Sequence, residues 1–259
     1  MSTPVPLQAA SRPGDHFSGH ADLYAKYRPS YPPALFEWLA AQCRAHKLAW
    51  DCGTGNGQAA IALAGHFSRV IGTDLSAEQI ARAAPAANVS YRAAPADASG
   101  LPVASVDLVT VAQALHWFCG TPFYTEVRRV LKPGGVIAAW TYRLLDAEPA
   151  INALVADFHG RIVGPFWPAE RHWVDAGYAG MPFPFEEIVA PAFEIELHWT
   201  LDDLLAYLRT WSATQRFIKE RGDDPTLPLG GALKEMWGDP DATKRIVWPL
   251  AIRCGRFAG

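Results

Sequence analysis

A glycine-rich segment from Asp51 to Gly57 holds the residues whose types and spacing are best suited to chemistry. It reads Asp-Cys-Gly-Thr-Gly-Asn-Gly, with glycines at alternate positions. Glycine allows a tight turn and a close approach of the backbone to a ligand, and the N–H groups that open a following helix attract anionic groups. The segment therefore predicts a loop that binds a nucleotide-like cofactor, although a turn that only packs tightly has the same composition.

The spacing of these glycines bears on the type of cofactor. Dinucleotide-binding loops carry the pattern G-x-G-x-x-G, whereas Gly53, Gly55 and Gly57 are evenly spaced. An NAD-dependent oxidoreductase is therefore the weaker alternative.

Two acidic residues follow at the ends of later predicted strands. A carboxylate at Asp74 can accept hydrogen bonds from both hydroxyls of a ribose, or it can cap the next helix. Asp97, within Ala96-Asp97-Ala98, can accept from an exocyclic amine while a neighbouring backbone N–H donates to a ring nitrogen. Adenine offers both groups, and a simple turn is the alternative.

The elements that must position these residues alternate between short apolar strands and helices. After a helix at 34 to 46, this rhythm predicts a parallel, doubly wound α/β sheet with helices on both faces. Ser76 is a suitable cap for the helix that it precedes. Strands are expected at 48–50, 69–73, 89–93, 106–112 and 136–142, and helices at 58–67, 77–84 and 121–131.

The chain from 1 to 259 is interpreted as a single domain, with a core at 34 to 142. The stretch from 143 to 190, rich in Pro, Trp and Phe, predicts an insertion that lies over the sheet and shapes a pocket. A second capping piece is expected at 200 to 240. It contains a helix at 201–211 and a loop-rich part at 222–240, and strands at 193–199 and 245–257 complete the sheet.

The order of these motifs resembles the class I S-adenosylmethionine (SAM)-dependent methyltransferases of the type 11 group. The resemblance covers residues 48 to about 142, and it rests on segments 49–55, 70–74, 96–97 with 101–102, and 130–135. It implies a Rossmann-like, mostly parallel seven-stranded sheet whose last strand is antiparallel. It also implies SAM as the cofactor, with its methionine end on the loop, its ribose on Asp74 and its adenine near Asp97. The residues that this resemblance assigns to SAM are Asp51, Gly53, Thr54, Gly55, Asp74, Leu75, Ala96 and Asp97.

A second group of segments is similar to the branch that contains the trans-aconitate methyltransferases of fungi, which implies a small-molecule acceptor. Tyr24 and Arg28 could close over the carboxylate and sulfonium of SAM through a charge-assisted hydrogen bond and a cation–π contact, or they could form a surface turn. The segments that carry this similarity are Tyr24, Tyr27, Arg28-Pro29, Tyr31-Pro32, 116–118 and 207–212.

Methyl transfer is an in-line displacement at an activated carbon, so the protein mainly aligns the acceptor and excludes water. A base is optional, and His116 is the candidate for that role, with a structural role as the alternative. Gln113 could hydrogen-bond the cofactor or the acceptor, or pack at a strand end; we count it with the cofactor residues. Trp117 and Trp211 are candidate walls of the acceptor pocket, and core packing would explain them equally well.

Composition narrows the classes of partner. The net charge is -3, with 19% charged residues and no basic run, so the sequence predicts no nucleic-acid binding. The four cysteines are scattered, which fits a reducing cytosol, and neither a metal site nor a membrane span is expected. The leading interpretation is methyl transfer from SAM to an oxygen of a small organic acceptor. An NAD-dependent oxidoreductase and a non-catalytic SAM-binding module are the alternatives.

Overall fold

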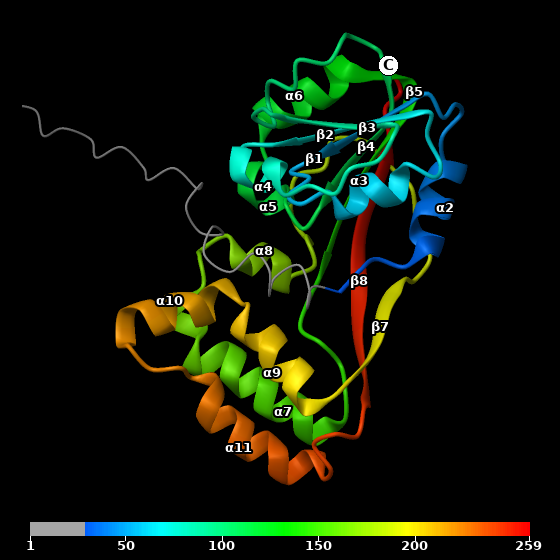
Figure 1. Ribbon diagram of the computed structural model, residues 1–259. Helices are drawn as coiled ribbons and strands as arrows, with labels where there is room; N and C mark the ends of the chain where they lie inside the picture. Colours follow the sequence, from blue (N-terminus) through cyan, green and yellow to red (C-terminus); the bar gives the residue numbers. More distant parts are fainter. Residues whose placement is uncertain (1–28) are drawn as a thin grey trace, which may run out of the picture.

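Five parallel strands form the centre of the computed structural model, which describes residues 29 to 259 (Figure 1). They lie in the order β3-β2-β1-β4-β5, then the antiparallel β8 and the short β6, so the predicted mostly parallel, seven-stranded sheet with an antiparallel last strand is confirmed. The strands are β1 Leu48–Cys52, β2 Arg69–Asp74, β3 Val89–Ala93, β4 Val106–Ala112, β5 Leu131–Tyr142, β6 Glu186–Glu187 and β8 Lys244–Arg256.

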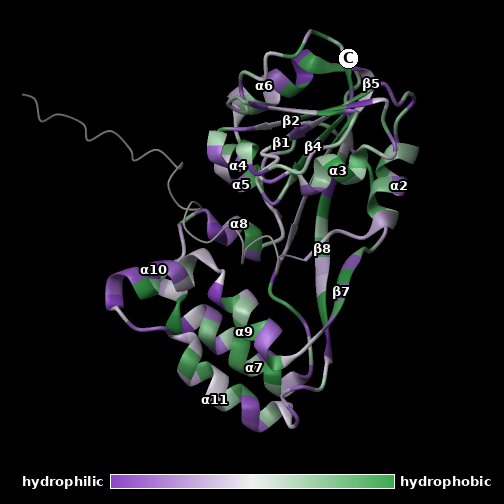
Figure 2. Cartoon of the chain, in the orientation of Figure 1, coloured by the Kyte–Doolittle hydropathy of each residue, from purple (hydrophilic) through white to green (hydrophobic). Residues whose placement is uncertain are grey.

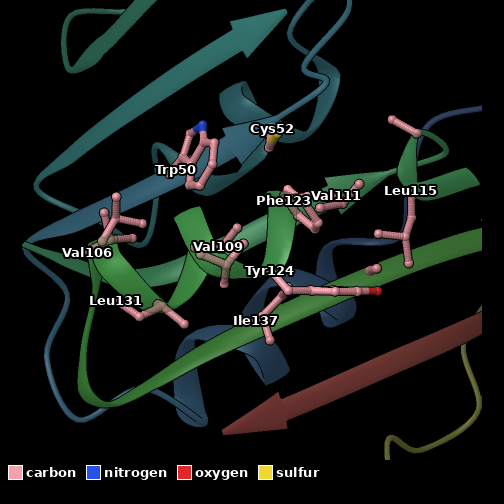
Figure 3. Close-up of a cluster of buried hydrophobic side chains, with 14 of the residues drawn as sticks. Trp50, Cys52, Val106, Val109, Val111, Leu115, Phe123, Tyr124, Leu131 and Ile137 are labelled. Carbon is pink, nitrogen blue, oxygen red and sulfur yellow. The ribbon is translucent and has the colours of Figure 1, made fainter. Parts of the chain in front are cut away.

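Helices cover both faces of this sheet because its strands are apolar on both sides. On β4, Leu108 points to one buried cluster and Val109 to the other, as expected from the two-residue period of a strand. Figure 3 shows the second cluster, in which Val109 and Ile137 lie near Phe123. One face is covered by α2 Pro33–Ala41 and α3 Gln58–Leu63, and the other by α5 Leu115–Phe118 and α6 Thr121–Val130. The helix α4, Ala77–Ala81, is capped by Ser76, whose hydroxyl accepts a hydrogen bond from the N–H of Gln79.

Strand β8 connects the sheet to a separate layer of helices. Residues 250–256 of β8 pair with β5, whereas residues 244–249 pair with β7, Glu194–Trp199. The two-stranded ribbon of β7 and β8 extends away from the sheet toward the helices in the lower part of Figure 1. Residues of these helices form a buried core together with Trp248. One of them, α10, carries mostly hydrophilic residues (Figure 2). The helices of this layer are α7 Pro149–Asp157, α9 Leu201–Arg209, α10 Ser212–Arg221 and α11 Thr226–Trp237.

Two expectations for the second half of the chain are corrected. The part at 222–240 is not loop-rich, because α11 occupies most of it; Leu229, Leu233 and Trp237 form its buried face, and Gly230-Gly231 obscured that pattern in the sequence. The segment at 143–190 does not lie over the sheet as one insertion. Its first part joins the helical layer through α7 and a π-helical turn, Phe158–Ile162, and its second part returns to the sheet as α8, Arg171–Asp175, and β6.

A buried carboxylate joins the end of β1 to its neighbours. Asp51 is fully buried, and its two oxygens accept hydrogen bonds from the hydroxyls of Thr54, at 2.5 Å, and Thr110, at 2.8 Å. Burial raises the pKa of Asp51 to about 6 despite these two hydrogen bonds, which oppose the shift. The folded protein therefore binds this proton more tightly than the unfolded chain does.

We expect Asp51→Asn to change the pH dependence of stability. The pKa of Asp51 is raised from 3.8 to about 6 on folding, so its contribution weakens the fold as the pH rises through this window. The free energy of unfolding of the wild type relative to the variant should therefore fall by up to about 1.4 kcal/mol per pH unit between pH 4 and 6, and level off above that range. Urea denaturation at a series of pH values measures this difference, with the exposed Asp241→Asn as control. Parallel curves for the wild type and Asp51→Asn would contradict the prediction.

Candidate functional site

A cavity of about 540 Å³ lies at the carboxyl ends of the parallel strands. In an open parallel sheet, ligands bind at this edge, where the strand order reverses; here that point falls between β1 and β4. In the described part of the chain, all residues that line the cavity belong to the segment from Tyr31 to Tyr142. The helical layer therefore contributes no wall to it, contrary to the expectation that residues 143–190 and 200–240 shape the pocket.

The glycine-rich loop forms one wall of the cavity. The φ angles of Gly53, Gly55 and Gly57 are 69°, 55° and 88°, which lie in the left-handed region that favours glycine. The N–H groups of Gly53 and Thr54 both donate to the carbonyl of Thr73, at 2.8 and 2.9 Å, which holds the loop against β2. A Cβ atom on Gly53 would lie only 2.6 Å from the Cβ of Ala114. The loop thus needs glycine both for its turn and for its close contact with the end of β4.

Asp74 lies beside this loop and lines the cavity. Its Oδ2 accepts from the N–H of Gly55 and its Oδ1 from the N–H of Ser76, both at 2.9 Å. Each carboxylate oxygen has a further lone pair, so Asp74 can still accept from a vicinal diol. Its neighbour Leu75 also lines the cavity and is 62% exposed, which leaves an apolar side chain free to contact a flat ring.

Two further residues assigned to the cofactor, Ala96 and Asp97, line the same end of the cavity. Asp51 does not, because it is fully buried beneath the loop. The expectation that Asp51 contacts a ligand is thus replaced by a supporting role: it holds Thr54, which does line the cavity.

Aromatic side chains also line the cavity. They are Trp117, which the sequence indicated as a candidate, and Tyr31, Phe118 and Tyr142, which it did not; Phe118 lies beside Gly53 of the loop. Tyr142 could have been found from its position, since it is the last residue of β5 and carboxyl ends of parallel strands meet at one edge. Gln113 also lies here, with a φ of 55°.

The other predicted site residues lie elsewhere. His116 does not line the cavity, and its Nδ1 lies 3.2 Å from the hydroxyl of Tyr178. Trp211 is buried within the helical layer, with its ring centroid 5.6 Å from that of Trp167. Tyr24 and Arg28 lie outside the described residues.

Within residues 29–259, no group of three or more His, Cys, Asp or Glu side chains is arranged to hold a metal ion. No helix in the same range combines the length and apolar character needed to cross a membrane.

Comparison with known proteins identifies the family. Residues 50–139 match the model of the methyltransferase domain. The chain is 31% identical over 251 residues to a protein of Dictyostelium discoideum named as a methyltransferase, covering 95% of each chain, and 33% identical over 221 residues to one of Schizosaccharomyces pombe, covering 82% of this chain and 84% of that one. Among solved structures, a type II methyltransferase of Anaeromyxobacter dehalogenans is 44% identical, with a TM-score of 0.84 and coverage of 89% of this chain and 98% of that chain.

These similarities extend over nearly the whole chain and agree with the observed sheet order and the position of the cavity. The glycine-rich loop and the first residues of β4 both fall inside the matched domain. The chain belongs to the class I SAM-dependent methyltransferases.

Proposed function

We propose that the protein transfers the methyl group of SAM to an oxygen, of a hydroxyl or a carboxylate, in a small organic acceptor. The observation that carries this proposal is that one cavity is lined both by Asp74, Asp97 and the glycine-rich loop and by Trp117 and Tyr142. A volume of about 540 Å³ is within the range of small-molecule sites. Family membership argues against the NAD-dependent oxidoreductase that the glycine-rich loop left as an alternative.

The residues at the loop end of the cavity fit SAM. Asp74 has lone pairs available for the two ribose hydroxyls, and the exposed Leu75 offers an apolar surface to the adenine. Ala96 and Asp97 would lie near the adenine edge. Gly53 and Gly55 line the cavity without side chains, and a Cβ at Gly55 would meet no atom within 4 Å, so the backbone of the loop is open to the methionine end. When bound, SAM supplies a methyl group that its sulfonium has already activated.

The contribution of the chain to transfer is alignment and the exclusion of water. Aromatic residues of the cavity lining, such as Tyr31 and Trp117, would hold the acceptor against the methyl group. We assign no proton transfer to His116, because it lies off the cavity wall and its Nδ1 faces Tyr178. The similarity to trans-aconitate methyltransferases makes a polycarboxylate one acceptor to test.

We also propose that the protein acts in a reducing compartment such as the cytosol. All four cysteines are free, and Cys52 and Cys254 are buried. Unpaired cysteines in this number are typical of proteins that are not exposed to an oxidising environment.

Asp74→Ala should weaken SAM binding at least about tenfold, because the variant loses two charge-assisted hydrogen bonds to the ribose. Isothermal titration with SAM measures the change. The exposed Asp241→Ala serves as the control and should bind like the wild type. Undiminished affinity in Asp74→Ala would contradict the assignment, and no binding to the wild type would overturn the proposed function itself.

Gly53→Ala should also reduce SAM affinity about tenfold or more, since the added methyl group forces the loop away from Ala114 at a backbone angle that alanine rarely adopts. The matched control is Gly231→Ala in α11, where an added Cβ meets no atom within 4 Å. That variant should keep its affinity and gain about 1 kcal/mol of stability, because alanine favours a helix. Equal SAM affinities for the two variants would show that the loop is not the binding element.

Methyl transfer itself should be detectable by mass spectrometry after incubation with SAM and a library of hydroxylated and carboxylated small molecules. The expected result is an acceptor heavier by one methylene unit, formed together with S-adenosylhomocysteine. A protein that binds SAM and forms no product with any library member would instead be a non-catalytic SAM-binding module.

A further inference from the structure

Gln113 is held in an unusual conformation at the end of β4. Its φ of 55° is rare for a residue other than glycine, and its N–H donates to the carbonyl of Trp140 at 2.9 Å. The hydroxyl of Thr141 donates to its Oε1 at 2.7 Å. Strained backbone conformations persist where the surrounding structure holds them, and they are frequent at functional sites.

The contact with Thr141 belongs to a longer buried chain of polar groups. Thr141 is close enough to the fully buried Tyr178 to influence the pKa of its hydroxyl, and this hydroxyl lies 3.2 Å from Nδ1 of His116. Burial raises the pKa of Tyr178 well above its usual value, so its hydroxyl stays protonated and can donate. Thr141 therefore fixes the side chain of Gln113 and takes up its amide oxygen, and Tyr178 lies next to Thr141.

The amide nitrogen of Gln113 is left without a partner. Nε2 is buried and forms no hydrogen bond with any of the described residues. A buried donor without an acceptor is destabilising, so such a group in a folded protein calls for an explanation. Because Gln113 lines the cavity, a bound oxygen atom is an acceptor that would satisfy it.

The position of Gln113 on the sheet separates it from the cofactor end. Along the sheet edge the order is β3, β2, β1, β4 and β5, so Asp97 and Asp74 lie on one side of the glycine-rich loop and Gln113 and Tyr142 lie on the other. If SAM extends from Asp97 to the loop, the space beside Gln113 belongs to the acceptor. This step rests on the proposed function.

The character of this space indicates what it accepts. The cavity that contains it is lined by the aromatic residues Tyr31, Trp117, Phe118 and Tyr142, and no lysine, arginine or histidine of residues 29–259 belongs to this lining. None of these described residues would pair with a carboxylate placed there, and a desolvated charge without a partner is costly. Aromatic walls favour flat rings, and a neutral amide donor favours the oxygen of a hydroxyl group attached to such a ring.

We propose that Gln113 binds the acceptor, with Thr141 and Tyr178 as residues that position it, and that the acceptor is an uncharged hydroxyaromatic compound. The Nε2 of Gln113 donates a hydrogen bond to the reacting hydroxyl oxygen of this compound. In the transfer, a lone pair of that oxygen forms the new bond to the methyl carbon, the electrons of the broken carbon–sulfur bond stay on sulfur, and the hydroxyl proton passes to water. Gln113 is thereby reassigned from the cofactor to the acceptor.

The test compares two sets of acceptors with the full-length protein and SAM. The hydroxyaromatic set is 7-hydroxycoumarin and 1-naphthol, and the polycarboxylate set is trans-aconitate and citrate. We expect methylated product from the first set only. Transfer to the polycarboxylates, or no transfer to either hydroxyaromatic compound by protein that binds SAM, would overturn the acceptor class. Absence of SAM binding would count against the proposed function instead.

Variants test the role of the network. Gln113→Met should raise the KM for the hydroxyaromatic acceptor about tenfold while the Kd for SAM, measured by titration, stays unchanged. Thr141→Val should also raise this KM, whereas Thr141→Ser, which keeps the hydroxyl, should have the wild-type value. The KM of the double variant Gln113→Met/Thr141→Val should not exceed that of Gln113→Met alone. Thr125→Val removes an exposed hydroxyl on α6 and should behave like the wild type. An acceptor KM unaltered in Gln113→Met, or a SAM Kd raised in step with it, would refute the assignment.

Discussion

The arrangement of the site depends on one buried carboxylate, that of Asp51. Its two oxygens accept hydrogen bonds from Thr54 on the loop and Thr110 on β4, and so fix the loop relative to the strand that ends just before Gln113. Burial of this group is unfavourable for its ionised form, which is why its pKa rises to about 6. The same two hydrogen bonds hold the loop after β1 and the end of β4 next to each other, and both line the cavity.

The molecule divides its tasks between two layers. Among residues 29–259, the cavity is lined by the segment from Tyr31 to Tyr142, whereas the helical layer buries its own core around Trp248 and Leu204. The two parts are joined by β8, which changes partner from β7 to β5 along its length. The aromatic residues of the second half thus serve mainly to build that core, and Trp211 is an example.

The first half of the chain was predictable because each local signal agreed with the tertiary structure. Short apolar strands, the Ser76 cap and the glycine-rich turn are all specified within a few residues. The helix α11 was missed because Gly230 and Gly231 weaken its local helical signal, while its buried face is stabilised by packing against α7 and α9. Tertiary packing there overrides intrinsic propensity.

By itself, the sequence determined the parallel α/β sheet, the glycine-rich loop and the acidic residues Asp74 and Asp97, because these depend on local backbone chemistry and on the order of strand ends. Only the tertiary structure decided that Asp51 supports the loop from beneath, that His116 turns toward Tyr178, and that Gln113 has a buried donor with no partner among residues 29–259. Side-chain direction and burial at these positions depend on contacts between residues far apart in the chain, such as Asp51 with Thr110 and His116 with Tyr178. Such contacts leave no periodic pattern in the sequence.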